Sequence, residues 1–130
     1  MSLTSPDSPV KGNPFCNYNH IAFVLHEQDH VIAEVQMHPE SLNSGGVAHG
    51  GLIFSMGDTA AGHAARTDGR RYVTQTSTIH FISNVGLGHT IRAEARIQHR
   101  GQATCLVDVR FTNEEERLLA SGTYTFFCIG

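Results

Sequence analysis

The sequence predicts an α+β domain in which one antiparallel β-sheet packs around one long helix. Residues 52–66 lack proline and are apolar on almost every side, which is typical of a buried helix. The runs before and after this segment alternate apolar and polar residues with a period of two, as half-buried strands do. Short turns join consecutive runs, and strands joined in this way pair antiparallel. Because a flat sheet covers only one side of a helix, we expect the sheet to curve.

The expected order of elements is two strands, the helix and four further strands. Residues 1–14 are rich in Ser, Pro and Gly and are expected to form a flexible N-terminal arm, which leaves 15–130 as a single domain. Strands are expected at residues 20–25, 31–37, 72–82, 90–98, 103–111 and 118–129. Apolar sheet edge left over by this arrangement favours a homo-oligomer.

Composition excludes several classes of protein. The 130 residues carry 9 Lys and Arg against 12 Asp and Glu, a formal net charge of −3, which argues against a nucleic-acid-binding protein. No run approaches the roughly 20 apolar residues of a membrane span, and we expect no membrane partner. Cys16, Cys105 and Cys128 are odd in number and widely spaced, so we expect reduced thiols and a cytoplasmic protein.

The nine histidines raise the question of a metal site. His26 to His30 matches the H-E-x-x-H pattern, which binds zinc in metalloproteases when it lies on a helix. Here the pattern lies between two strands, so a hairpin is expected in which the two imidazoles do not share a face. No other Cys or His spacing is typical of zinc, and we expect no metal ligand set.

A glycine-rich loop, Gly45 to Gly51, runs directly into the helix. It matches neither the dinucleotide-binding nor the P-loop pattern. Backbone N–H groups of Gly50 and Gly51 would be exposed at the helix N-terminus, where they can hold an anion or a developing oxyanion. A flexible start of the helix with no ligand is the alternative interpretation.

Asp58 is a carboxylate two turns into this apolar helix. Such a group is costly to bury unless it is paired or takes part in chemistry. The alternative is a solvated position on a thin polar strip with Ser55 and Thr59. No G-x-S-x-G motif is present, so the sequence gives no support for a serine-hydrolase triad.

Asn43, Gly46, His49-Gly50-Gly51 and Asp58, nine residues after His49, form a pattern that resembles the hotdog-fold acyl-CoA thioesterases of the phenylacetate-pathway (PaaI-like) type. The resemblance covers about residues 15–129. It implies a hotdog fold, a curved antiparallel β-sheet wrapped around one long central helix. It also implies hydrolysis of an aryl- or fatty-acyl-CoA to the free acid and coenzyme A. Active sites would lie at the interface of a homodimer, and two dimers would form a homotetramer.

The resemblance also implies roles for individual residues. The Gly50 N–H would hold the oxyanion, and Asp58 from the neighbouring subunit would act as general base or as nucleophile. Asn43 would position the water or the thioester, and His49 would line the site and fix the loop. Thr74 matches a position where relatives carry a hydroxyl beside the acid.

The substrate-binding set is drawn from the same resemblance. Thr76 is the near alternative to Thr74, Gly51 would contact the substrate beside Gly50, and Arg100 would contact the phosphates of coenzyme A. The acyl pocket would be lined by Leu52, Phe54, Met56 and Phe81. Asn84 stands where many relatives carry proline. The chemistry needs no metal or redox cofactor, since coenzyme A enters only as part of the substrate.

Two other functions fit the same fold. One is a non-catalytic acyl-CoA-binding module, which would bind acyl-CoA without releasing thiol. The other is an acyl-thioester dehydratase or hydratase, which would carry a differently placed histidine and acid. A thiol-release assay separates these from a thioesterase.

Overall fold

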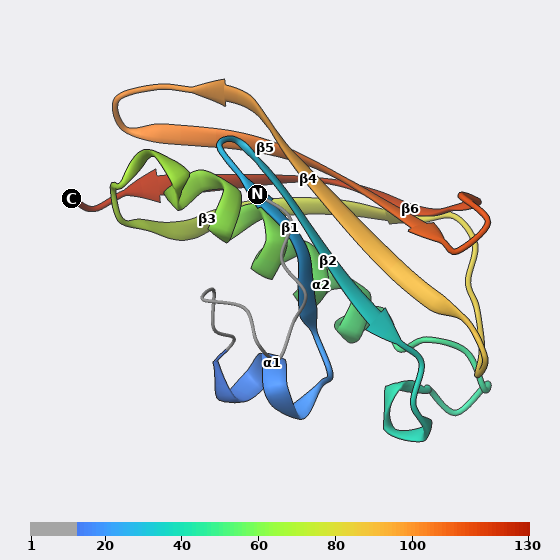
Figure 1. The fold of residues 1–130 in the computed structure, drawn as a ribbon. Helices are drawn as coiled ribbons and strands as arrows, with labels where there is room; N and C mark the ends of the chain where they lie inside the picture. Colours follow the sequence, from blue (N-terminus) through green and yellow to red (C-terminus); the bar gives the residue numbers. More distant parts are fainter. Residues whose placement is uncertain (1–12) are drawn as a thin grey trace.

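The computed structural model describes residues 13–130, and its centre is one curved sheet with helix α2 along one face (Figure 1). The strands are β1 (Ala22–Glu27), β2 (His30–Gln36), β3 (Tyr72–Phe81), β4 (Thr90–Arg100), β5 (Thr104–Asn113) and β6 (Leu118–Cys128). They lie in the order β1-β2-β4-β5-β6-β3, and every neighbouring pair is antiparallel. The α+β class and the hotdog architecture are confirmed.

The helices differ from the expected ones at their ends. Helix α2 (Gly50–Ala65) begins two residues earlier than predicted, because His49 caps it. A short helix, α1 (Pro14–Tyr18), was not predicted; Pro14 opens it and the Asn13 side chain accepts a hydrogen bond from the Cys16 N–H. Asn13 and Pro14 are the only described residues that belong to the predicted N-terminal arm. The rest of that arm, residues 1–12, lies outside the described residues. Two 3-10 turns, η1 (Pro39–Ser41) and η2 (Arg66–Asp68), flank α2 in the sequence.

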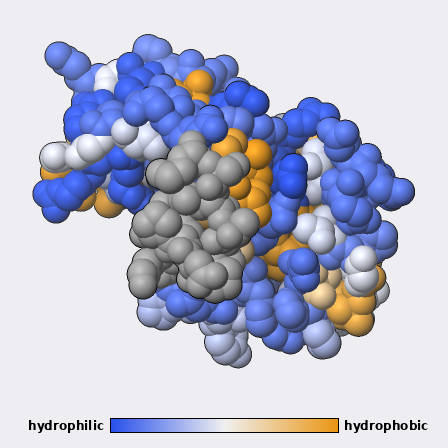
Figure 2. Space-filling model, viewed as in Figure 1, coloured by the Kyte–Doolittle hydropathy of each residue, from blue (hydrophilic) through white to orange (hydrophobic). Residues whose placement is uncertain are grey.

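The core lies between α2 and the inner face of the sheet. Alternate residues of β2 and β4 point inward, as the period of two predicts: Val31, Ala33 and Ala93 are fully buried. The outer face carries charges, among them the Arg92–Glu34 ion pair across β2 and β4. On the face seen in Figure 2 hydrophilic residues prevail, and hydrophobic ones form separate patches.

Gly57 sets how closely α2 approaches the sheet. A Cβ atom at this position would lie 2.2 Å from the Tyr124 hydroxyl and 2.6 Å from the Phe111 ring. Both aromatic side chains are fully buried beneath the helix. The Tyr124 hydroxyl donates a hydrogen bond of 2.9 Å to the carbonyl oxygen of Phe54, which anchors the middle of α2 on β6.

The H-E-x-x-H pattern lies on a β-hairpin, as predicted. Gln28 and Asp29 form the turn between β1 and β2, and Asp29 adopts a left-handed backbone with φ of 62°. His26 faces α2 and contacts His63, whereas His30 bonds Glu94 on the sheet. The two imidazoles therefore do not form the ligand pair of a metalloprotease.

Strand β3 is one edge of the sheet and is unusually open. Of its ten residues only Tyr72 is buried. Val73 and Phe81 are about half exposed, at 47% and 53%. A long, exposed edge strand presents unpaired backbone groups and is a site where another chain can pair.

Candidate active site

The first part of the candidate site is the N-terminus of α2. The His49 backbone is extended (φ −64°, ψ 133°), and its Nδ1 accepts a hydrogen bond of 2.8 Å from the Gly51 N–H. This cap satisfies one of the free donors of the first turn. Among residues 13–130, no group accepts a hydrogen bond from the Gly50 N–H. One donor at the positive end of the helix is thus open to a ligand.

The loop before α2 is held rigidly from both sides. Asn43 Oδ1 accepts hydrogen bonds from the N–H groups of Gly45 (2.8 Å) and Val47 (3.3 Å). The Asn84 side chain donates to the Ala48 carbonyl at 3.0 Å. The sequence singled out Asn84 only as a departure from the pattern of relatives, and its anchoring role became visible only in the structure.

Asp58 lies on the strip of α2 that the sheet does not cover. Its Oδ1 accepts a hydrogen bond of 2.6 Å from the hydroxyl of Thr74, near the start of β3. A pocket of about 280 Å³ opens beside them, and its lining also includes Thr59, His63 and Arg66. The structure therefore joins the two residues that the resemblance placed together.

The groups around this pocket are electrostatically uneven. Burial, with smaller effects of Arg66 and His26, lowers the pKa of His63 to about 4, so its imidazole is neutral at pH 7. Burial raises the pKa of Tyr124 far above its usual value, and the nearby Asp58 carboxylate adds to that shift. The Asp58 carboxylate thus lies near the neutral Tyr124 hydroxyl of β6 and near the Arg66 guanidinium; burial lowers the pKa of Arg66, and the Asp58 carboxylate opposes that shift.

Thr76, the alternative to Thr74, does not reach Asp58. A bulge between Thr74 and Thr76 shifts the register of β3 against β6. Thr74 pairs with the buried Phe126, whereas Thr76 pairs with the half-exposed Thr125. Because neighbouring residues of β6 face opposite sides of the sheet, the bulge directs the two threonines to opposite sides.

The apolar residues proposed for the acyl pocket separate into two groups. Phe54 is partly exposed (37%) on the open strip of α2, as is Gly51. The Phe81 ring lies about 3.4 Å from the position that a Cβ atom of Gly50 would take, so it borders the open N–H donor. Met56 is fully buried in the core, whereas Leu52, 8% exposed, lines a pocket with His49 and Gly51. Contact of either side chain with an acyl group stays a prediction.

Arg100 is occupied within the chain. Its guanidinium lies 2.7 Å from both Asp68 and Asp29 and donates to the carbonyl oxygens of Ala64 and Ala65. The side chain is only 20% exposed. These bonds close the C-terminal end of α2, and they hold Arg100 away from the lining of the Asp58 pocket. Contact of Arg100 with the phosphates of coenzyme A stays a prediction.

Gly50 and Asp58 lie on one rigid helix, eight residues apart. At 1.5 Å rise per residue this separation is about 12 Å along the axis. A reacting carbonyl must lie about 3 Å from both its oxyanion donor and the base or its water. One chain by itself therefore does not bring both groups to one carbonyl.

The comparison with known families decides the class. Residues 45–120, from the glycine loop through β5 into β6, match the model of the thioesterase superfamily. The chain belongs to this superfamily. It is 27% identical over 100 residues to the acyl-coenzyme A thioesterase PaaI of Escherichia coli. The aligned region covers 77% of this chain and 71% of that protein. This thioesterase-superfamily member is thus a thioester hydrolase.

Solved structures carry the same fold. The E. coli PaaI protein superposes with a TM-score of 0.88 at 24% identity, over 92% of this chain and 86% of that one. A Streptococcus mutans protein bound to acetyl-CoA has a TM-score of 0.82 and 33% identity, over 96% and 95%. A hypothetical thioesterase of Streptococcus pneumoniae, solved with coenzyme A, has a TM-score of 0.81 and 30% identity, over 85% and 86%.

Proposed function

We propose that this protein hydrolyses an acyl-CoA thioester to the free acid and coenzyme A. The observation that carries the proposal is the Asp58 carboxylate, held by the Thr74 hydroxyl at 2.6 Å beside a pocket on the open strip of α2. The relatives solved with acetyl-CoA and with coenzyme A support this class of substrate. Two single mutants of the S. pneumoniae thioesterase were also solved, one with alanine in place of an aspartate and one with alanine in place of a threonine. That aspartate and threonine are sixteen residues apart, as are Asp58 and Thr74.

The proposed reaction needs a base and an oxyanion donor. Asp58 removes a proton from water, and the water oxygen attacks the thioester carbon. The carbonyl oxygen, on which negative charge develops, accepts a hydrogen bond from the Gly50 N–H at the helix N-terminus. Collapse of the tetrahedral intermediate breaks the C–S bond, and the thiolate leaves and takes up a proton. If Asp58 instead attacks directly, water hydrolyses the resulting anhydride.

Other residues would hold the substrate and the loop. Asn43 Oδ1 accepts hydrogen bonds within the loop. The NH2 group of the same side chain would then orient water or the thioester. His49 fixes the Gly51 N–H. Phe54 and Phe81 offer exposed aromatic surface to an aryl or alkyl acyl group.

We further propose that the active unit is a homodimer. The separation of about 12 Å between Gly50 and Asp58 in one chain requires that the two groups at one thioester come from different subunits. The open edge of β3 offers the surface for a second copy, because antiparallel pairing of two such strands would satisfy their backbone groups. Association of two dimers into a homotetramer, and a cytoplasmic location, remain predictions; the three cysteines are free thiols, and no helix within residues 13–130 is long and apolar enough to cross a membrane.

The direct test is Asp58→Asn, which keeps the size of the side chain and removes its basicity. We expect thiol release from a panel of aryl- and alkyl-CoAs to fall by at least about 10²-fold, the usual contribution of a general base. Asp108→Asn, at an exposed aspartate on β5, is the matched control and should leave the rate unchanged. Near-normal turnover by a folded Asp58→Asn protein would refute the assignment.

A second experiment tests the shared site. Proline suits the first position of a helix and lacks an N–H, and His49 already has the extended backbone that precedes proline. Gly50→Pro should therefore remove the oxyanion donor without unfolding α2. The inactive Gly50→Pro and Asp58→Asn proteins are mixed in equal amounts and allowed to exchange subunits. About half of the resulting dimers are heterodimers, and one of the two sites in each heterodimer has both groups intact. Mixing should therefore restore about a quarter of wild-type activity. If each site lay within one chain, mixing would restore none.

A further inference from the structure

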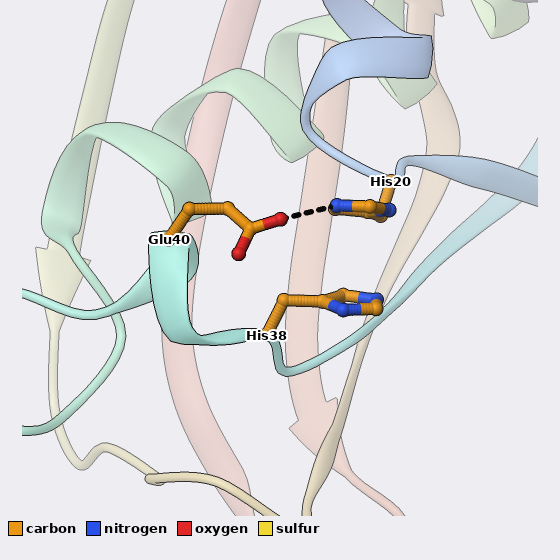
Figure 3. Close-up of side chains that lie close together, drawn as sticks. All are labelled: His20, His38 and Glu40. Atoms are coloured by element: carbon orange, nitrogen blue, oxygen red, sulfur yellow. Dashed lines mark hydrogen bonds and ion pairs between the residues drawn. The ribbon is translucent and has the colours of Figure 1, made fainter.

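A cluster of three side chains lies on a different part of the molecule from the Asp58 pocket. His20 stands between α1 and β1, and His38 and Glu40 stand at the start of η1 (Figure 3). His20 Nε2 and Glu40 Oε1 are 2.7 Å apart. The rings of His20 and His38 are stacked, with centroids 3.7 Å apart and planes inclined by 21°. Residues eighteen to twenty positions apart thus converge on one point.

The backbone at His20 is unusual for a histidine. Its φ is 60°, in the left-handed region, at the residue that follows the C-cap of α1. Glycine is the residue that takes this position most easily, because a Cβ atom costs about 1 kcal/mol there. The chain instead carries an imidazole, whose Nε2 lies 2.7 Å from Glu40 Oε1.

The three side chains together form a set of metal donors. Each offers one ligand atom, and the three ligand atoms lie within 4.8 Å of one another. Two imidazole nitrogens and one carboxylate oxygen suit Zn²⁺ and related divalent transition metals, and a water molecule can complete a four-coordinate site. Donors on one tetrahedral zinc lie about 3.4 Å apart for bonds near 2.05 Å. His20 Nε2 and Glu40 Oε1, now 2.7 Å apart, must separate slightly, and separations that reach up to 4.8 Å must shorten by up to about 1.4 Å. The His20 and Glu40 side chains are 37% and 53% exposed, which leaves them free to rotate.

We propose that His20, His38 and Glu40 form a binding site for one divalent transition-metal ion of the Zn²⁺ type. The ion would replace the hydrogen bond and the ring stack with three coordinate bonds. Such a site joins α1 to η1. None of the three residues lines the pocket that contains Asp58 and Thr74, whereas Glu40 lines a second pocket with His49 and Gly51.

The site would brace the loop that carries the catalytic residues. The residue after Glu40 is Ser41, whose carbonyl accepts a hydrogen bond of 2.9 Å from the His49 N–H. Leu42 and Ala48 then form an isolated β-bridge at the base of the same loop. An ion that fixes Glu40 therefore limits the movement of both ends of the segment between Ser41 and His49.

The test is titration of the full-length protein with ZnCl₂ by calorimetry, with thermal unfolding in parallel. We expect one Zn²⁺ per chain and a melting temperature that rises with zinc concentration, because the ion binds the folded state. His38→Ala and Glu40→Gln should weaken binding by at least about ten-fold. His20→Gly removes the imidazole yet suits the left-handed backbone. It should abolish binding while the metal-free protein stays as stable as the wild type.

Two controls address other histidines. His99→Ala, at an exposed histidine on β4, should bind zinc as the wild type does. His26 and His63 have ring nitrogens 3.3 Å apart and are the rival pair, so His63→Gln is the second control. The proposal is overturned if the wild type binds no zinc, if His20→Gly and His38→Ala bind it unchanged, or if His63→Gln abolishes binding. None of these outcomes depends on thioesterase activity.

Discussion

The two ends of helix α2 are built in opposite ways. At the C-terminal end, Arg100 donates to the carbonyl oxygens of Ala64 and Ala65 and forms ion pairs with Asp68 and Asp29. At the N-terminal end, His49 engages the Gly51 N–H, and the Gly50 N–H makes no hydrogen bond within the described residues. One end is closed by the chain, whereas the other is left open.

This difference separates stability from chemistry along a single element. A closed C-terminus fixes the helix against the sheet, because the Arg100 Nη1 and Nη2 groups bond its carbonyl oxygens and the two carboxylates, and only the buried Arg100 Nε has no partner among these described groups. An open N-terminus keeps a donor and the positive end of the helix dipole for a ligand. Substitutions at the closed end should therefore change stability, and substitutions at the open end should change catalysis.

The largest effect is expected at the closed end. Arg100→Met leaves Asp29 without its cation and Asp68 with Arg70 alone, and it also removes the bonds to the carbonyl oxygens of Ala64 and Ala65. We expect a loss of about 3 kcal/mol in the free energy of unfolding. Urea denaturation measures this loss, and thiol release by the folded fraction should keep its kcat and KM. A selective rise in KM for acyl-CoA would instead restore the original expectation that Arg100 contacts the phosphates of coenzyme A.

The next effect depends on pH. Burial alone would raise the pKa of Asp68, but hydrogen bonds from Tyr72 and Arg70 outweigh it and hold the pKa well below the ordinary value of 3.8. A depressed folded-state pKa contributes stability above pH 4 that is lost as the pH falls through the folded pKa. Asp68→Asn should cost about 2 kcal/mol at pH 7. Its stability, followed by thermal unfolding between pH 7 and pH 2, should fall less steeply than that of the wild type; parallel curves would contradict this.

A smaller effect on stability is expected at the open end. His49→Ala removes the cap of α2 and should cost about 1 kcal/mol, whereas His49→Asn, a good capping residue, should restore most of it. Both variants should lose thioesterase activity if the imidazole also lines the site. Equal activity of the two variants and the wild type would limit His49 to capping.

The smallest effect at neutral pH is expected for His63→Gln in the middle of the helix. The pKa of His63 is about 4 in the folded protein and about 6.5 when unfolded, so the unfolded state binds a proton more tightly. Wild-type stability should therefore fall as the pH is lowered from 6.5 to 4, and the variant should lose this dependence. Denaturant midpoints at pH 7, 6, 5 and 4 provide the measurement. An unchanged slope would show that His63 titrates normally.

Much of the fold follows from patterns that are local in sequence. The period of two placed the six strands within a few residues of their observed bounds, because the side of a strand that a residue faces depends only on its position along the chain. The loop was predicted from its glycine cluster, and the helix from a run that lacks proline and is apolar on almost every side. Helix α1 was missed, since five residues are too few for a periodic signal.

The sequence by itself determined the elements, the class of fold and, through the resemblance, the pair of Gly50 and Asp58. The tertiary structure decided which distant groups meet. Because of a bulge in β3, Thr74 and not Thr76 is the residue that bonds Asp58. The closed end of α2 gave Arg100 its ion pairs, and the turn after α1 brought His20 to Glu40. Such contacts depend on register and on the direction of side chains in three dimensions, which no spacing along the chain records.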